Sequence, residues 1–278
     1  MSAENTLLKV LVDKINNDTL VLPTLPDIVL KVRRTADDPN VSLNQMAEVI
    51  SLDPSLSARM MRIANSAFLG RAIKAESMLQ AVNRIGLDQI KNIATALALE
   101  QLYVSKNDVI KAYLEQVWKR NIAVMSHSIA VFHYFSKYHK GSKLDLDVMT
   151  LCALLHNIGV LPILTEAERS PKDYATPDFL NTAIQKLSGR IGLSIVRAWH
   201  LGSDFEQVVL GWRDLNLQST QPNYTDFIRL GAVAAGYFKS HQGKVIETAM
   251  KKNIIRDIEV FEETEYLDAL QLVKEAFD

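Results

Sequence analysis

Apolar residues recur every three or four positions along most of this chain, which is the spacing of one face of an α-helix. Leu7, Leu8, Leu11 and Ile15 predict a first helix that ends near residues 16–17. The strict alternation of a half-buried β-strand finds almost no support anywhere in the sequence. The pattern therefore predicts an all-α protein.

Helix start and stop signals divide the first hundred residues. Ser42 with Gln45 has the spacing of a capping box, and Asp53-Pro54 places an N-cap before a proline in the first turn. Ser77 is an N-cap for a helix that Gly86 ends, and residues 87–103 form a long apolar helix. Residues 65–70 are expected to be a loop.

The second half continues the helical pattern. Residues 109–138 predict either two helices or one long bent one, and residues 148–158 predict a short, very apolar helix that should be buried. Gly159 to Pro162 should break the chain. Further helices are predicted at 177–187, 189–199, 203–213, 224–238 and 266–277.

Composition narrows the class of protein. The 278 residues are 48% hydrophobic, and 31 basic residues against 32 acidic ones give a formal charge of −1, so no overall positive field indicates nucleic acid as a partner. No apolar run approaches the roughly 18 residues that cross a bilayer, so we expect no membrane contact. The single Cys152 forbids an internal disulfide and suits a reducing compartment, and the start of the chain lacks a basic signal-peptide region. We expect a cytoplasmic protein.

Most candidate reactive side chains favour ordinary structural roles. Cys152 lies in an apolar run, where burial raises the pKa of a thiol and makes it a poor nucleophile. His127, His133 and His139 are spaced by six residues, so successive members of a helix point apart and cannot share a metal ion. The segment with chemical interest is Leu154-Leu155-His156-Asn157-Ile158-Gly159.

That segment resembles the Leu-His-Asp-Ile-Gly motif of the HD-family phosphohydrolases, in which adjacent His and Asp bind a divalent metal. Four further motifs resemble, in the right order, the HDOD domain, the HD-related output domain of bacterial signalling proteins. They are Leu22-Pro23-Thr24-Leu25-Pro26, the stretch from Asp53-Pro54 to Arg59, Ile63-Ala64-Asn65-Ser66-Ala67-Phe68, and Ala81-Val82-Asn83-Arg84-Ile85-Gly86. The resemblance covers about residues 20 to 214.

The chain departs from the metal-binding pattern that the resemblance implies. Arg120 stands two residues after Trp118, where catalytic relatives have a His, and Asn157 replaces the Asp. The later ligand positions correspond to Ser188, to Trp212-Arg213, and to Gly231 or Ala232. By this alignment, only His156 remains of the ligand set.

A divalent ion needs several anionic or imidazole ligands, so we expect no metal, no cofactor and no catalysis. His156 is interpreted first as a core histidine at a helix end, and second as a residual ligand or acid–base group. Arg120 is expected to enter the space of the metal, with the Asn157 carbonyl as one acceptor. Trp199 and Trp212 are expected to pack in the core.

The predicted architecture is a two-lobed bundle of helices. An HDOD-like domain covers 20–215, with an N-terminal lobe to about 103 and a degenerate HD lobe from about 104, and a helical extension covers 216–278. The resemblance implies a non-catalytic bacterial signalling module that acts on unidentified signalling proteins. Two alternatives stay open. One is a weak metal-dependent phosphohydrolase acting on a nucleotide or cyclic dinucleotide. The other is a regulator that binds a small anion or nucleotide in the vestigial cleft, whose candidate residues are His156, Asn157, Arg120, Arg190, Trp199 and Arg213.

Overall fold

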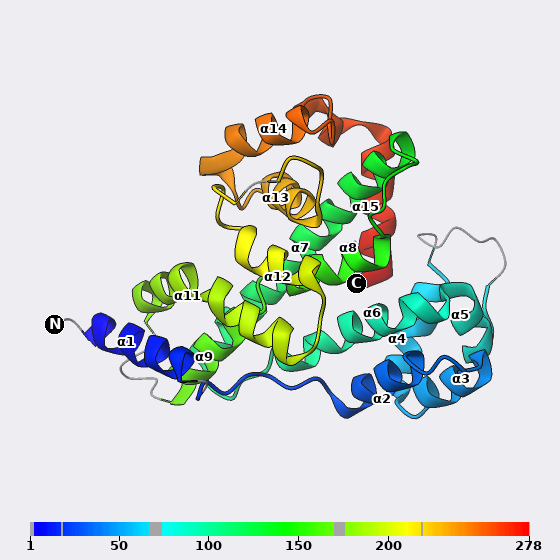
Figure 1. The fold of residues 1–278 in the computed structure, drawn as a ribbon, viewed down its shortest axis with the longest axis horizontal. Helices are drawn as coiled ribbons and strands as arrows, with labels where there is room; N and C mark the ends of the chain where they lie inside the picture. The colour runs from blue at the N-terminus through cyan, green and yellow to red at the C-terminus, as the bar shows by residue number, and fades with distance from the viewer. Residues whose placement is uncertain (1–2, 18, 67–73, 170–175, 218, 278) are drawn as a thin grey trace. The chain divides into compact units, whose positions relative to one another are not determined.

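The fold of the chain is all-helical, as the hydrophobic pattern predicts (Figure 1). A computed structural model describes residues 3–17, 19–66, 74–169, 176–217 and 219–277, and no β-strand occurs among them. The α-helices are α1 (Ala3–Asn16), α2 (Asp27–Ala36), α3 (Leu43–Ser51), α4 (Pro54–Ala64), α5 (Met78–Ile85), α6 (Leu87–Ala98), α7 (Asp108–Tyr138), α8 (Leu146–Leu155), α9 (Val160–Arg169), α11 (Pro177–Ala198), α12 (Ser203–Gly211), α13 (Tyr224–Ala234), α14 (Gln242–Lys251) and α15 (Thr264–Phe277). Short 3₁₀ turns lie at η2 (Leu99–Leu102), η3 (Lys239–His241) and η4 (Ile258–Glu262).

The helices form two compact units, each built from segments that are distant in sequence. The first unit comprises Met1–Thr24, Gln101–Asn121 and Leu154–Ser219, and the second comprises Leu25–Glu100, Ile122–Ala153 and Thr220–Asp278. The candidate site residues all belong to the first unit. The domain boundaries inferred from the sequence stay predictions.

In the first unit, α11 packs against α1, α9 and α12. Lys14 at the end of α1 pairs with the buried carboxylate of Glu166 on α9, with 2.5 Å between Nζ and Oε2. Trp199 follows α11 and donates from its indole nitrogen to the carbonyl of Pro23 at 3.0 Å. These contacts join the first 24 residues to the helices that surround the site.

In the second unit, helices α2 to α6 share one hydrophobic core. Val32, Met46, Ile50, Met60 and Ile90 have no exposed surface. The helix starts follow the sequence signals: Ser42 and Gln45 form the predicted capping box, and Asp53 and Ser77 cap α4 and α5. Gly86 has φ +94°, a left-handed conformation that favours glycine, and it separates α5 from α6.

Two residues of the sequence motifs, Asn65 and Arg84, bind backbone groups at the end of α4 and after it. Asn65 caps the C-terminal end of α4, and its side chain donates to the carbonyl of Ala75 at 2.9 Å and accepts from the Ala75 amide at 2.6 Å. Arg84 donates to the carbonyl of Ala64 at 2.8 Å and to Asn65 Oδ1 at 3.1 Å. Most of the predicted loop at 65–70 lies outside the described residues.

Two expectations about helix boundaries are wrong. Residues 160–169 form α9 although Gly159 to Pro162 were expected to break the chain, and Pro162 is tolerated because it lies in the first turn of the helix. Residues 177–198 form one helix, α11, not two. Gly189 and Gly192 serve close packing there, since a Cβ at these positions would lie 3.3 Å from Val209 O and 3.0 Å from Val209 Cβ.

The apolar segment Leu146–Arg169 corrects the expectation that no stretch is long enough to cross a membrane. Its 24 residues are long and apolar enough to cross a membrane, because α9 continues the apolar pattern of α8. Its most apolar window is 89% buried inside the protein. A core helix of a soluble protein has the same properties, so this segment is weak evidence for a membrane span.

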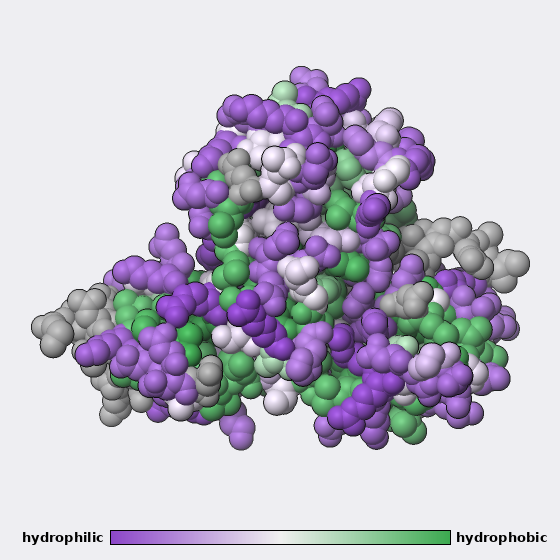
Figure 2. Space-filling model, viewed as in Figure 1, coloured by the Kyte–Doolittle hydropathy of each residue, from purple (hydrophilic) through white to green (hydrophobic). Residues whose placement is uncertain are grey.

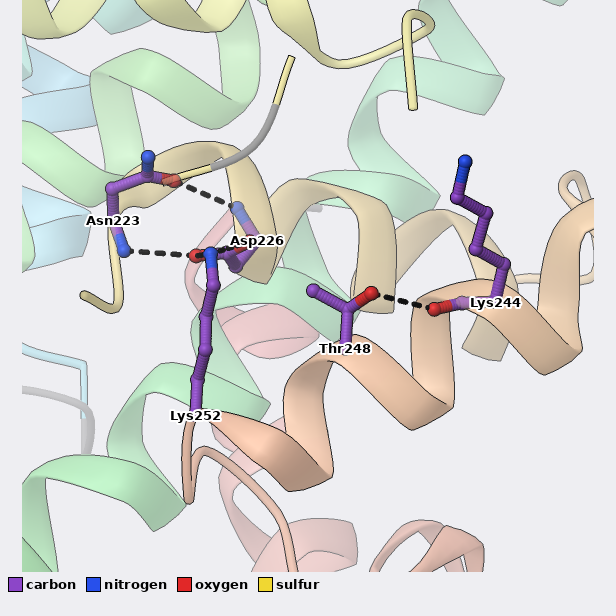
Figure 3. Close-up of polar contacts among 5 residues, drawn as sticks. All are labelled: Asn223, Asp226, Lys244, Thr248 and Lys252. Atoms are coloured by element: carbon purple, nitrogen blue, oxygen red, sulfur yellow. Dashed lines mark hydrogen bonds and ion pairs between the residues drawn. The ribbon is translucent and has the colours of Figure 1, made fainter. Parts of the chain in front are cut away.

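The C-terminal helices carry a buried ion pair (Figure 3). Asn223 and Asp226 form a capping box at the start of α13. Lys252, directly after α14, places Nζ 2.8 Å and 2.7 Å from the two carboxylate oxygens of Asp226. The side chains are only 6% and 4% exposed, so the pair fixes the end of α14 to the start of α13.

Candidate functional site

The candidate site is centred on the turn that joins α8 to α9. Helix α8 ends at Leu155, and residues 156–159 form the turn before Val160. His156 and Asn157 are 1% and 3% exposed. Gly159 lies against α11, where a Cβ would be 1.9 Å from the carbonyl oxygen of Ser188, so only glycine fits this turn. The packing of α11 therefore fixes the position of His156 and Asn157.

Arg213 is the side chain that contacts Asn157. Its Nη2 donates to Asn157 Oδ1 at 2.9 Å. Sequence reasoning expected Arg120 to approach this carbonyl, and the structure assigns the bond to Arg213 instead. Both arginines were candidates, but Arg120 lies on α7 and Arg213 follows α12, and two long side chains from distant segments cannot be ranked by sequence position.

Trp212 joins the histidine to the arginine. Its ring meets the His156 ring edge to face, with centroids 4.6 Å apart, and the Arg213 guanidinium lies over it at 4.2 Å. Trp212 is 1% exposed, so its predicted core packing is confirmed. A cation over an indole face is favourable, and more so where water is excluded.

The site has a positive electrostatic character. Burial, followed by the positive charge of Arg120, lowers the pKa of Arg213 to about 10. The two guanidinium charges therefore repel each other. At neutral pH both remain charged.

Asn121, the residue after Arg120, belongs to a polar cluster that the sequence did not predict. Asn121, which has no exposed surface, donates from Nδ2 to the hydroxyl of Tyr103 at 2.9 Å, and the Tyr103 ring lies 5.0 Å from that of Trp118. Burial raises the pKa of the Tyr103 phenol. Asn121 Oδ1 is buried and accepts no hydrogen bond from the described residues. A lone amide inside an apolar helical pattern was the signal for this cluster.

The structure does not bring all the predicted site residues together. Arg190 is exposed and donates to Asn16 Oδ1 on α1 at 3.1 Å. Trp199 is 8% exposed and, as described, binds Pro23, which fits its predicted packing role. Arg120, Asn157 and Arg213, with His156 against Trp212, form the remaining cluster.

These residues do not fit a divalent metal ion. The cluster presents one imidazole, one amide and two guanidinium groups, and a metal ion would be repelled by the two fixed positive charges. No group of three His, Cys, Asp or Glu side chains that could hold a metal occurs in the described ranges. Gly231, one position aligned with the last Asp, has no room for a side chain, because a Cβ would lie 2.1 Å from Ser128 Oγ and 2.6 Å from the Val124 carbonyl.

Comparison with known families shows the family of the chain. A model of the HDOD domain matches residues 22–211. The chain belongs to the HDOD domain family. The resemblance found in the sequence motifs and the all-α fold that it implied are both confirmed.

Solved structures and a curated relative resemble this HDOD chain. A protein of Shewanella amazonensis SB2B named "Putative metal-dependent phosphohydrolase" is 36% identical, with a TM-score of 0.94 and 100% of both chains covered. A Marinobacter aquaeolei VT8 protein named "Putative signal transduction protein" is 18% identical, with a TM-score of 0.51, 92% of this chain and 61% of that chain covered.

An uncharacterized protein of Treponema pallidum (strain Nichols) is 25% identical over 193 residues, which is 65% of this chain. The chain spans about a third of the length of this curated relative, 35%.

Proposed function

We propose that this HDOD chain is a non-catalytic regulatory module of bacterial signal transduction that acts in the cytoplasm through contacts with other proteins. The observation that supports it is the hydrogen bond from Arg213 to Asn157. It places a fixed cation on the residue that stands where HD enzymes have a metal-binding Asp. Without a metal ion, no bound water is acidified toward a neutral pKa, so hydrolysis of a phosphoester lacks its nucleophile.

Apolar side chains are exposed for contacts with other proteins on the described surface. On the face in Figure 2, hydrophilic residues predominate and hydrophobic residues reach the surface in several places. The large exposed apolar side chains are spread along the sequence, from Val21 and Leu52 to Ile258 and Leu267.

A metal-dependent phosphohydrolase is the second candidate, favoured by the name of the 36% identical relative. An assay with added Mn²⁺, Mg²⁺ or Fe²⁺ on cyclic dinucleotides, guanosine polyphosphates and nucleoside monophosphates separates the two. We expect no turnover above the level of a His156→Ala control. Turnover that scales with protein concentration and is lost in His156→Ala would establish the enzyme instead.

A binding experiment with a partner protein tests the regulatory role. A partner captured from the host should be purified and titrated against this chain. We expect a saturable one-to-one complex. His156→Ala and Asn157→Ala should leave it intact, because a non-catalytic role requires no reaction at either residue. A complex that forms only while the chain turns over a substrate would contradict a contact-based role.

A further inference from the structure

We propose that Arg213 and Arg120 form a binding site for a phosphate-type oxyanion beside the turn that carries Asn157. This site is additional to the proposed regulatory function and does not depend on which protein the chain contacts. The hydrogen bonding, the charge and the packing of Arg213 support this site.

The Arg213 guanidinium has unused hydrogen-bonding capacity. Nη2 is bound to Asn157, whereas Nε is buried and has no hydrogen-bond partner among the described residues. None of the ion pairs within the described part of the chain includes Arg213. Its neutral contacts are the Asn157 amide and the Trp212 ring.

A half-buried guanidinium without an ion pair among the described residues, such as that of Arg213, is energetically unfavourable. Removing a charge from water is costly unless it is paired and hydrogen-bonded, and a neutral amide supplies only part of that compensation. The planar fork of a guanidinium matches two oxygens of a phosphate or carboxylate. An oxyanion that accepted a bond from Nε would supply the missing counter-charge.

The second arginine adds to this preference. Arg120 belongs to the same unit as Arg213, and its positive charge lowers the pKa of Arg213. Both arginines are partly exposed to solvent. An anion between two like charges turns their mutual repulsion into two attractions, and a doubly charged phosphate does so more strongly than chloride.

The surroundings favour the phosphate itself over a nucleobase. Trp212, the aromatic ring of the cluster, is 1% exposed and is contacted by Arg213 and His156. It has no exposed face on which a base could stack. Free phosphate and the phosphate of a nucleotide share the recognised group, and the experiment distinguishes them.

Isothermal titration of the full chain with inorganic phosphate tests the site, with sodium chloride at matched ionic strength as the reference. We expect saturable one-to-one binding that Arg213→Gln weakens by at least about tenfold, the effect of losing a charged hydrogen bond. Arg190→Gln is the matched control, because Arg190 is an exposed arginine of the same unit that binds Asn16, and it should bind as the wild type does.

The second variant guards against misfolding. If circular dichroism shows that Arg213→Gln is unfolded, Arg120→Gln gives the test, with the same direction expected. Equal responses to phosphate and chloride, no binding at millimolar phosphate, or unchanged binding in the folded variants would overturn the proposal.

Titration with a nucleoside monophosphate identifies the source of the anion. Affinity equal to that of inorganic phosphate indicates a free ion, whereas tighter binding that is still lost in Arg213→Gln indicates a nucleotide. Binding without hydrolysis leaves the proposed regulatory function intact. Hydrolysis of the bound nucleotide would contradict that function while leaving the anion site in place.

Discussion

Asn157 and Arg213 define the chemistry of the site at the scale of single residues. The sequence could indicate that a carboxylate is missing at 157 and that arginines stand at 120 and 213. It could not indicate which guanidinium reaches the amide, because that depends on how α7 and the end of α12 approach the turn at 156–159. The Tyr103–Asn121 bond was missed for the same reason.

Replacing Asn157 with Asp should not create a metal site. The new carboxylate would pair with Arg213, which already lies 2.9 Å from the amide oxygen, and His156 would still lack the other ligands. Isothermal titration of Asn157→Asp with Mn²⁺ should therefore show no binding. Micromolar one-to-one binding would mean that Arg213 does not neutralise this position.

His127 should make folding sensitive to acid. Burial, followed by the positive charge of Lys274, lowers its pKa from 6.5 to about 4, and its Nδ1 is hydrogen-bonded to the Tyr266 hydroxyl. The unfolded chain takes up a proton near pH 6.5 but the folded chain does not, so the free energy of unfolding should fall as the pH falls from about 6.5 to about 4. With allowance for solvent screening, the loss should be about 1 kcal/mol.

Urea unfolding at about pH 7 and about pH 4.5 measures this loss. His127→Gln should lose less stability than the wild type between the two conditions, whereas His133→Gln, a change at an exposed histidine of the same helix, should behave as the wild type does. Parallel losses in all three proteins would show that His127 has no such role.

At the scale of elements, close contacts between helices decide what the hydrophobic pattern leaves open. The pattern and the caps predicted most helices and their start positions, including Ser42, Asp53 and Ser77. Gly159 was interpreted as part of a chain break and Gly189 as the first residue of a helix, but both lie where backbones of neighbouring segments approach. The sequence does not distinguish a glycine that ends a helix from a glycine at a close contact between backbones. Only the packing partner distinguishes them.

Gly159→Ala should destabilise the fold strongly. The added Cβ would lie 1.9 Å from the Ser188 carbonyl oxygen and 2.6 Å from the Gly192 amide, and these backbone atoms cannot move aside without shifting α11. We expect a loss of about 3 kcal/mol or more. Gly243→Ala is the control: it meets nothing within 4 Å in α14 and should be neutral or stabilising by up to about 1 kcal/mol. Equal unfolding midpoints for the two variants would contradict the packing described.

Two adjacent lysines allow the buried ion pair to be tested against an exposed one. Lys252→Ala leaves Asp226 uncompensated with 4% of its side chain exposed, and should cost about 3–5 kcal/mol. Lys251→Ala removes a pair with Glu247 whose side chains are 72% and 65% exposed, and should cost less than about 0.5 kcal/mol. Chemical denaturation of both variants measures the difference, and similar costs would show that the Asp226 pair is open to solvent.

At the scale of the whole molecule, the HDOD motifs predicted the family and the fold correctly, whereas the two units are not simple halves of the sequence. The first 24 residues join the unit that contains the candidate site, and residues 220–278 join the unit that contains α2 to α6. Periodicity reports which face of a helix is apolar but not which other helix covers it. The packing of α1 against α9 and α11 therefore depends on contacts between residues far apart in sequence, such as Lys14 with Glu166 and Asn16 with Arg190.

The metal content of the purified chain tests the central claim most directly. The protein should be produced in medium supplemented with iron and manganese, desalted without chelator and measured by mass spectrometry for Fe, Mn, Mg, Zn and Ni. The account predicts only substoichiometric metal, unchanged by His156→Ala, because guanidinium and amide groups stand at the ligand positions. One tightly bound ion per chain that is lost in His156→Ala would contradict it.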